Sequence, residues 1–284
     1  MSDLSLIKEL REKTGAGFLD CKNVLSENNN DIEQSIDSLR KKGLAKASKK
    51  SSREANEGAV GFYKNENISV ILKINSETDF SAKSDTFLDF LDSIGNVALG
   101  TNNVNLNLND FLKIEDNGKT VSDLLTEMIA KIGENLIIND LKVYDNKESN
   151  LNYYIHNPYR KNIGKIISVV FYSSDKETDD VKKFSKNICM HIAASKPEAI
   201  DIDMLPNKII ESEKKIQEEM IKDSGKPSNV MEKILDGKMK KFYSEVTLLN
   251  QSFVIDTDKT VKEAISDFNS SNSFILKNYI LITL

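Results

Sequence analysis

Hydrophobic residues in the first fifty positions recur at spacings of three and four, which is typical of amphipathic helices, and short polar segments interrupt them. The three apolar faces are Leu4, Ile7 and Leu10; then Phe18, Leu19, Val24 and Leu25; then Ile32, Ile36 and Leu39. Asp31, with Gln34 three residues later, predicts the start of the third helix, and Gly43 predicts its end. The pattern therefore predicts a bundle of three helices, and we assign residues 1–54 to this first domain.

A basic, serine-rich stretch follows the predicted bundle. Its cations are Lys41, Lys42, Lys46, Lys49, Lys50 and Arg53. A charge run of this kind is most often a solvated linker. Contact with a nucleic acid or with an acidic partner is the other interpretation.

From Gly58 the hydrophobic period changes from that of a helix to the alternation of strands. The expected elements are strands over 58–64 and 68–74, a helix that starts at Thr78-Asp79 and runs through 82–99, an asparagine-rich loop over 101–109, a helix over 121–132 and a strand over 136–143. The order strand, strand, helix then repeats. The second copy has strands over 151–156 and 163–172, a turn over 157–161 and a helix from 179 or 180 to 194.

Two copies of one supersecondary unit predict an α+β protein with two similar core subdomains, each with helices on one face of an antiparallel sheet. We assign residues 55–145 and 146–284 to them. The second subdomain carries an insertion over about 200–242, with charged helices over 206–222 and 228–242 joined by a sharp turn at Ser224-Gly225-Lys226-Pro227. Strands over 245–249 and 273–284 and a helix over 258–269 are expected to complete the sheet.

Composition narrows the class of protein. The chain of 284 residues is 39% hydrophobic and 29% charged with a net charge of −5, which is typical of a soluble globular protein and argues against a general nucleic-acid binder. The two cysteines, Cys21 and Cys189, stand far apart, so we expect no disulfide. No stretch has the length of a membrane span, and no secretory leader is recognisable at the start. We therefore expect a cytoplasmic protein without membrane contact.

Motifs for catalysis or cofactor binding are missing from the sequence. The two histidines, His156 and His191, stand in no metal-binding spacing, and Gly225-Lys226 is followed by a proline and lacks the upstream glycine of a phosphate-binding loop. No nucleophile motif occurs either. We expect no catalytic centre, no cofactor and no metal.

The segment Thr78-Asp79-Phe80 marks a passage from a strand into a helix. In one interpretation Phe80 is a core residue and Asp79 caps the helix. In the other, Asp79 and Phe80 form a wedge that enters a groove of a partner protein, where a buried phenylalanine contributes about 1.5–3 kcal/mol. Spacing alone favours the first interpretation.

Six segments, in order along the chain, resemble signature blocks of the elongation factor Ts family. They are residues 10–22 (LREKTGAGFLDCK), 78–83 (TDFSAK), 131–135 (KIGEN), 191–198 (HIAASKPE), 224–227 (SGKP) and 240–242 (KKF). The resemblance implies a UBA-like module at the N-terminus and two similar α+β subdomains with a helical hairpin in the second. It also implies a guanine nucleotide exchange factor that binds elongation factor Tu in its GDP-bound and nucleotide-free forms and promotes GDP release by disturbing the magnesium and phosphate site.

The resemblance also implies which residues contact Tu. In the N-terminal module they are Arg11, Gly15, Gly17, Asp20 and Cys21; in the core they are Thr78, Asp79, Phe80, Ala82, Lys83, Ile132, Gly133 and His156. The chain departs from the family pattern in the longer turn that follows His156, in Ser81, which replaces a valine, and at its end on a strand. From that end we expect no contact through a C-terminal helical extension.

Three other hypotheses stay open at this stage. The chain could be a UBA-like adaptor that binds a protein without exchange activity. It could be an accessory protein that binds RNA through Lys41–Arg53. The helical hairpin could rest on Tu or on a second copy of the chain.

Overall fold

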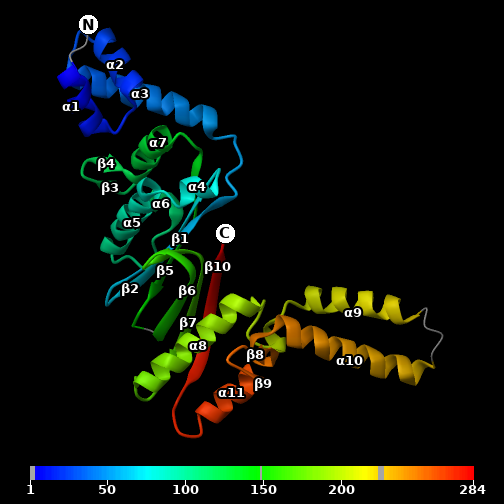
Figure 1. Cartoon of the computed structure of the whole chain (residues 1–284). Coiled ribbons are helices and arrows are strands. Elements are labelled where there is room, and N and C mark those ends of the chain that lie inside the picture. The colour runs from blue at the N-terminus through cyan, green and yellow to red at the C-terminus, as the bar shows by residue number, and fades with distance from the viewer. Residues whose placement is uncertain (1–3, 148, 223–226) are drawn as a thin grey trace. The chain divides into compact units, whose positions relative to one another are not determined.

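The computed structural model describes residues 4–147, 149–222 and 227–284 (Figure 1). It is a mixed α+β protein with N-terminal helices and antiparallel strands, as the hydrophobic pattern predicts. The chain divides into two compact units, residues 1–146 with 157–165 and 284, and residues 147–156 with 166–283. Most of the expected turn at 224–227 lies outside the described residues.

Three helices open the first unit, and the small core between them is aliphatic. The helices are α1 (Leu4–Thr14), α2 (Phe18–Glu27) and α3 (Ile32–Lys50). The core residues are Ile7, Leu10, Cys21, Val24 and Leu25. Asp31 caps α3, because its carboxylate accepts the N–H of Gln34 at 2.9 Å, as expected. Gly15, with φ of +66°, ends α1 in the left-handed conformation that glycine tolerates best.

The expectation that Gly43 ends the third helix is wrong, because α3 continues to Lys50. Gly43 is buried against α7, and an added Cβ would meet the Ala130 Cβ at 3.2 Å. This glycine therefore permits a close approach of two helices. The linker expected over Lys41–Arg53 is accordingly helical for most of its length.

The antiparallel sheet of the first unit has the order β1-β2-β5, and the start of β7 pairs with β1. Its strands are β1 (Glu57–Lys64), β2 (Ile68–Ser76) and β5 (Leu136–Asp145). The other elements of this unit are α4 (Asp79–Ala82), α5 (Asp85–Gly100), α6 (Leu108–Phe111), β3 (Glu115–Asp116), β4 (Lys119–Thr120) and α7 (Val121–Ile132). The single helix expected over 82–99 is interrupted at Lys83–Ser84, because the Ser84 hydroxyl accepts the N–H of Phe87 at 3.3 Å and starts α5 anew.

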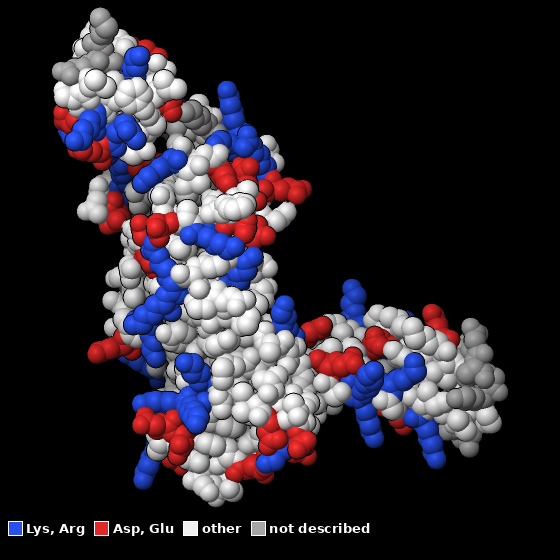
Figure 2. All heavy atoms as spheres, in the orientation of Figure 1, with Lys and Arg blue, Asp and Glu red and all other residues white. Residues whose placement is uncertain are grey.

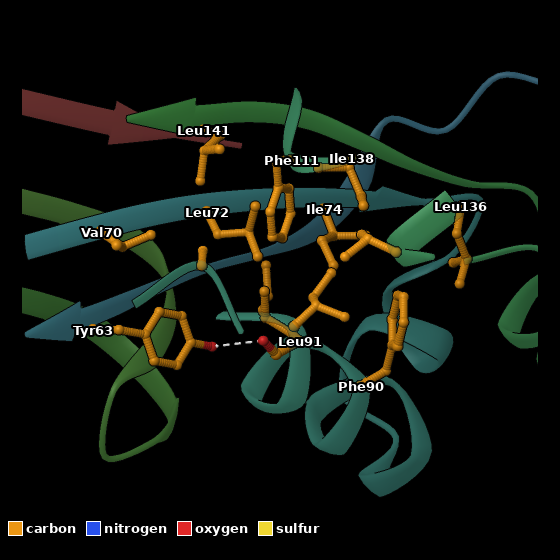
Figure 3. Close-up of a cluster of buried hydrophobic side chains, with 14 of the residues drawn as sticks. Tyr63, Val70, Leu72, Ile74, Phe90, Leu91, Phe111, Leu136, Ile138 and Leu141 are labelled. Atoms are coloured by element: carbon orange, nitrogen blue, oxygen red, sulfur yellow. Dashed lines mark hydrogen bonds between the residues drawn. The ribbon is translucent and has the colours of Figure 1, made fainter. Parts of the chain in front are cut away.

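The core of the first unit lies between this sheet and helices α5 and α7. Figure 3 shows the part of this core that the strands form with Phe90 and Leu91 of α5. Tyr63 is its polar exception. The ring of Tyr63 is buried, and its hydroxyl donates to the carbonyl of Leu91 at 2.9 Å. Gly61 and Gly95 stand against the ring, where an added Cβ would come within 2.6 Å and 2.2 Å of ring atoms. Two glycines thus make the space that this tyrosine fills.

The second unit is built on β7, which pairs with β6 and with β10. Its strands and helices are β6 (Asn150–Arg160), β7 (Ile163–Ser173), α8 (Asp179–Ser195), β8 (Ser252–Phe253), β9 (Asp256–Thr260), α11 (Val261–Phe268) and β10 (Ile275–Thr283). Aromatic rings fill its core, where Phe184 stacks on Phe268 with ring centroids 4.1 Å apart.

The expected turn over 157–161 and the expected strand over 245–249 are wrong, whereas the helix expected over 258–269 is present and starts three residues later than predicted. β6 continues to Arg160, so residues 157–160 of the expected turn are strand, with Asn157 in the left-handed conformation at φ of +49°. The strand expected over 245–249 is the end of α10 followed by a 3-10 helix, Leu248–Asn250. The last helix begins at Val261 because Thr260 and Glu263 form a capping box there.

The expected helical hairpin consists of α9 (Asn207–Lys222) and α10 (Ser228–Val246), which pack along one another (Figure 1). Lysine side chains lie among aspartate and glutamate on the face of the hairpin seen in Figure 2. A polar layer joins the helices, because Lys238 donates to Gln217 at 2.7 Å. Ile209, Ile216 and Met220 lie exposed on α9. The hairpin therefore presents both mixed charge and apolar side chains to its surroundings.

Within the described ranges, no helix combines the length and the apolar character that a bilayer crossing requires.

His191, buried in α8, gives a prediction about acid stability. Its Nδ1 accepts the N–H of Val254 at 3.3 Å, and Nε2 then donates to Gln251 at 2.9 Å. Burial lowers the pKa of His191 below its ordinary value, and the bond with Gln251 offsets part of that effect.

Below the ordinary value of 6.5, the His191 side chain binds a proton more readily in the unfolded chain than in the folded one. Stability is therefore lost as the pH falls below 6.5. In urea unfolding at about pH 7.5 and about pH 5.5, we expect the wild type to lose more stability on acidification than His191→Gln does. Equal losses in the two proteins would contradict the prediction.

Candidate functional site

Phe80 lies where β2 passes into α4, and its side chain stands in solvent. The exposed fraction of Phe80 is 85%, the largest among the exposed large hydrophobic residues of the described chain. The interpretation of Phe80 as a core residue is therefore wrong. The interpretation of Asp79 as the helix cap is wrong as well, because the Thr78 hydroxyl accepts the N–H of Ser81 at 3.2 Å and makes Thr78 the N-cap.

Asp79 and Lys83 form an ion pair across one helical turn. The Lys83 ammonium donates to the Asp79 carboxylate at 2.7 Å. This hydrogen bond, with smaller effects from the charges of Lys83 and Lys165, lowers the pKa of Asp79 below its ordinary value. The same hydrogen bond raises the pKa of Lys83. An ionised carboxylate therefore stands next to the exposed aromatic ring at neutral pH.

Two glutamates join the turn before α4 to the turn after α7. Glu134 accepts the N–H of Thr78 at 3.1 Å and the Thr78 hydroxyl at 2.7 Å. In the reverse direction, Glu77 accepts the N–H of Asn135 at 2.6 Å. Arg53 lies 3.4 Å from the Glu77 carboxylate. We call Glu77, Thr78, Glu134 and Asn135 the carboxylate clasp.

The clasp brings Ile132 and Gly133 to the same corner of the first unit as Asp79 and Phe80. Gly133 ends α7 with φ of +87°, and its carbonyl accepts a hydrogen bond from the ammonium group of Lys50. Ile132 is half-buried and packs on the core. Ala82 is fully buried, so it supports this corner from the protein interior.

The predicted residues of the N-terminal module gather at the turn between α1 and α2. Gly15, Gly17 and Asp20 line a groove of about 240 Å³ between this turn, α3 and α7. Arg11 is exposed on α1, whereas Cys21 lies in the small core. Burial raises the pKa of the Cys21 thiol, so the thiol stays protonated at neutral pH. Because Cys21 is fully buried, it cannot itself touch a partner.

The sequence analysis did not predict an apolar surface that this module exposes. Leu4, Phe18 and Leu19 are 72%, 42% and 70% exposed, although the spacing had assigned all three to the core. Helical geometry could have predicted the exposure of Leu19, because at about 100° per residue Leu19 falls on the side of α2 opposite Cys21.

Comparison with known proteins decides the family. The model of the family described as elongation factor TS matches residues 77–282. An elongation factor Ts of Rhizobium meliloti (strain 1021) is 39% identical over 267 residues, which cover 94% of this chain and 87% of that protein. An elongation factor Ts of Ehrlichia ruminantium (strain Welgevonden) is 40% identical over 265 residues, which cover 93% and 91%.

The chain belongs to the elongation factor Ts family. Its function is accordingly that of an elongation factor Ts, in the elongation stage of protein synthesis. The resemblance inferred from the signature blocks is confirmed, and the alternative of an adaptor without this function is not favoured. The matched span contains the corner with Phe80 and the clasp, whereas the α1–α2 turn precedes it.

His156, which the resemblance implied as a contact, lies in the second unit. His156 is half-buried in β6, and its Nδ1 lies 3.3 Å from the Tyr154 hydroxyl. Asp79 and Phe80 belong to the first unit. A direct role of His156 in this elongation factor Ts stays a prediction.

The basic stretch that suggested RNA binding uses several of its charges within the chain. Lys42 pairs with Glu27 at 2.7 Å, Arg53 with Glu77, and Lys50 with the Gly133 carbonyl. These contacts give the stretch a structural role in an elongation factor Ts. In the part of the chain that the structure describes, no three metal-ligating side chains come together.

Proposed function

We propose that this chain binds elongation factor Tu in its GDP-bound and nucleotide-free forms and promotes the release of GDP, with Phe80 as the inserted side chain. The observation that carries the proposal is the 85% exposure of a phenylalanine on a turn that four hydrogen-bonding residues hold in place. An aromatic side chain of this size is a strong anchor when a partner's groove buries it.

The exchange needs no bond-making centre in this chain. A protein that binds the nucleotide-free conformation of Tu more tightly than the GDP form lowers the affinity of Tu for GDP by the same factor, because the two binding equilibria are linked. Phe80 opens the partner's groove, and the ionised Asp79 beside it accepts hydrogen bonds from the groove's N–H groups. The magnesium and phosphate site of Tu is disturbed as a result, and GDP leaves.

Further contacts with Tu complete the proposal. The module over 1–54, which we take to be UBA-like, binds the GTPase domain of Tu through the α1–α2 turn with Arg11, Gly15, Gly17 and Asp20, and Cys21 supports this turn from within. Thr78, Lys83, Ile132 and Gly133 surround the inserted pair, the buried Ala82 supports them, and His156 adds a contact from the second unit. The two core subdomains, 55–145 and 146–284, share a similar arrangement of strands and helices. The hairpin rests on Tu or on a second copy of the chain.

The test is the release of a fluorescent GDP analogue from the cognate elongation factor Tu. The purified chain is added in increasing amounts with an excess of unlabelled GDP, and the release rate is followed with time. We expect the rate to rise with the concentration of the chain until Tu is saturated. A rate that stays at its spontaneous value, with the complex present by size-exclusion chromatography, would overturn the proposal.

A further inference from the structure

The carboxylate clasp joins segments that are remote in sequence, and it does so in both directions. Thr78 gives two donors to Glu134 across 56 positions, and Asn135 gives its N–H to Glu77 across 58 positions. Each of the two turns therefore supplies one accepting glutamate and also donates to the glutamate of the other turn. Hydrogen bonds to charged acceptors are stronger than bonds between neutral groups.

The element that carries Phe80 cannot hold its own shape. α4 has four residues, Asp79–Ala82, and one helical turn is far below the length at which a helix is stable alone. Phe80 itself contributes little packing, since most of its side chain is in solvent. The direction of the Phe80 ring is therefore set by the residues on which the turn rests, and Thr78 is the first of these.

The two glutamates are partly buried, and Glu77 has a further ionic partner. Glu134 is half-buried, and the Glu77 side chain is 21% exposed. Arg53, three residues beyond the end of α3, lies 3.4 Å from Glu77, and the Arg53 carbonyl accepts a hydrogen bond from the side-chain amide of Asn135 at 2.7 Å. The clasp thus has a third attachment, which comes from the N-terminal module.

We propose that Glu134 and Glu77 are positioning residues, whose carboxylates fix the Thr78–Phe80 turn so that Phe80 meets Tu in the correct direction. The proposal rests on the function proposed above. It assigns to Glu134 no contact with Tu or with the nucleotide, because both of its oxygens are used by Thr78.

A double-mutant cycle measures whether Glu134 acts through Phe80. We expect Glu134→Ala to slow GDP release from Tu about ten-fold, because two charge-assisted hydrogen bonds to the turn are lost. In the Phe80→Ala background the same change should have almost no further effect. Glu134→Gln keeps an amide oxygen that accepts one of the two donors, so it should recover part of the rate. An equal loss in both backgrounds would overturn the proposal.

Glu263 offers a matched control for loss of a capping carboxylate. Its carboxylate accepts the N–H of Thr260 at 2.8 Å and the Thr260 hydroxyl at 2.9 Å, which is the same pair of bonds that Glu134 makes with Thr78. Glu263 lies in the second unit, on α11. Glu263→Ala should leave GDP release unchanged, and a ten-fold loss there would mean that the assay reports stability alone.

Amide hydrogen exchange tests the positioning without Tu. In Glu134→Ala the N–H of Thr78 should exchange about ten-fold faster, while amides in β1 stay protected. We expect this result even if the wild type does not accelerate GDP release, because the measurement does not involve Tu. Failure of the proposed function can therefore be distinguished from failure of the positioning role. Unchanged exchange at Thr78 would overturn the positioning role.

Discussion

Phe80→Ala is expected to slow the release of GDP from elongation factor Tu roughly 10- to 100-fold, because burial of a phenylalanine ring contributes about 1.5–3 kcal/mol and each 1.4 kcal/mol is a factor of ten. Stability should not change, since the ring is 85% exposed and its removal leaves no cavity. The measurement compares GDP release at subsaturating amounts of the two proteins and their urea unfolding curves.

Ile275→Ala is the control for loss of an exposed apolar side chain. Ile275 is 60% exposed on β10, in the other unit. It should release GDP at the wild-type rate. A Phe80→Ala protein that retained the full rate would remove Phe80 from the mechanism, whatever the outcome for Ile275.

Gly95→Ala is expected to lower the free energy of unfolding by about 2–3 kcal/mol, because overpacking of a filled core has this cost. The added methyl would lie 2.2 Å from the ring of Tyr63. The ring cannot move aside easily, since it is buried and its hydroxyl is bonded to the Leu91 carbonyl. Urea unfolding at neutral pH measures the change.

Two further variants separate this clash from other effects of the substitution. Gly100 belongs to the same helix and has no atom within 4 Å of an added Cβ, so Gly100→Ala should be neutral or stabilising by up to about 1 kcal/mol. In a Tyr63→Leu background, Gly95→Ala should cost much less than it does alone. A similar cost in both backgrounds would show that the ring of Tyr63 is not the obstacle.

Local patterns in the sequence were sufficient for most elements. The alternation of apolar residues predicts β1 and β2, and the Asp31 cap predicts the start of α3, because each depends on residues within a few positions of one another. The signature at 78–83 likewise pointed to the site. The proposed insertion requires that Phe80 be exposed, whereas spacing alone favoured a buried Phe80.

Contacts between remote segments were beyond the sequence. Gly43 has the local signature of a helix end, yet α3 continues through it to Lys50, and an added Cβ there would meet Ala130 of α7 at 3.2 Å. Asn157 shows the same limit for strands. It takes a left-handed conformation that usually marks a turn, but pairing with β7 extends β6 through it. The clasp could not be predicted, because nothing in residues 77–78 indicates a partner at 134–135.

The clasp has a thermodynamic consequence for recognition. A turn that is already ordered in the free protein brings no folding entropy to be lost on association, so the enthalpy and heat capacity of binding report contact alone. For the corner that carries Phe80, the heat capacity change is then a modest negative one that follows the apolar area covered on the ring and on its receiving groove. It lacks the large negative value that marks a segment folding as it binds.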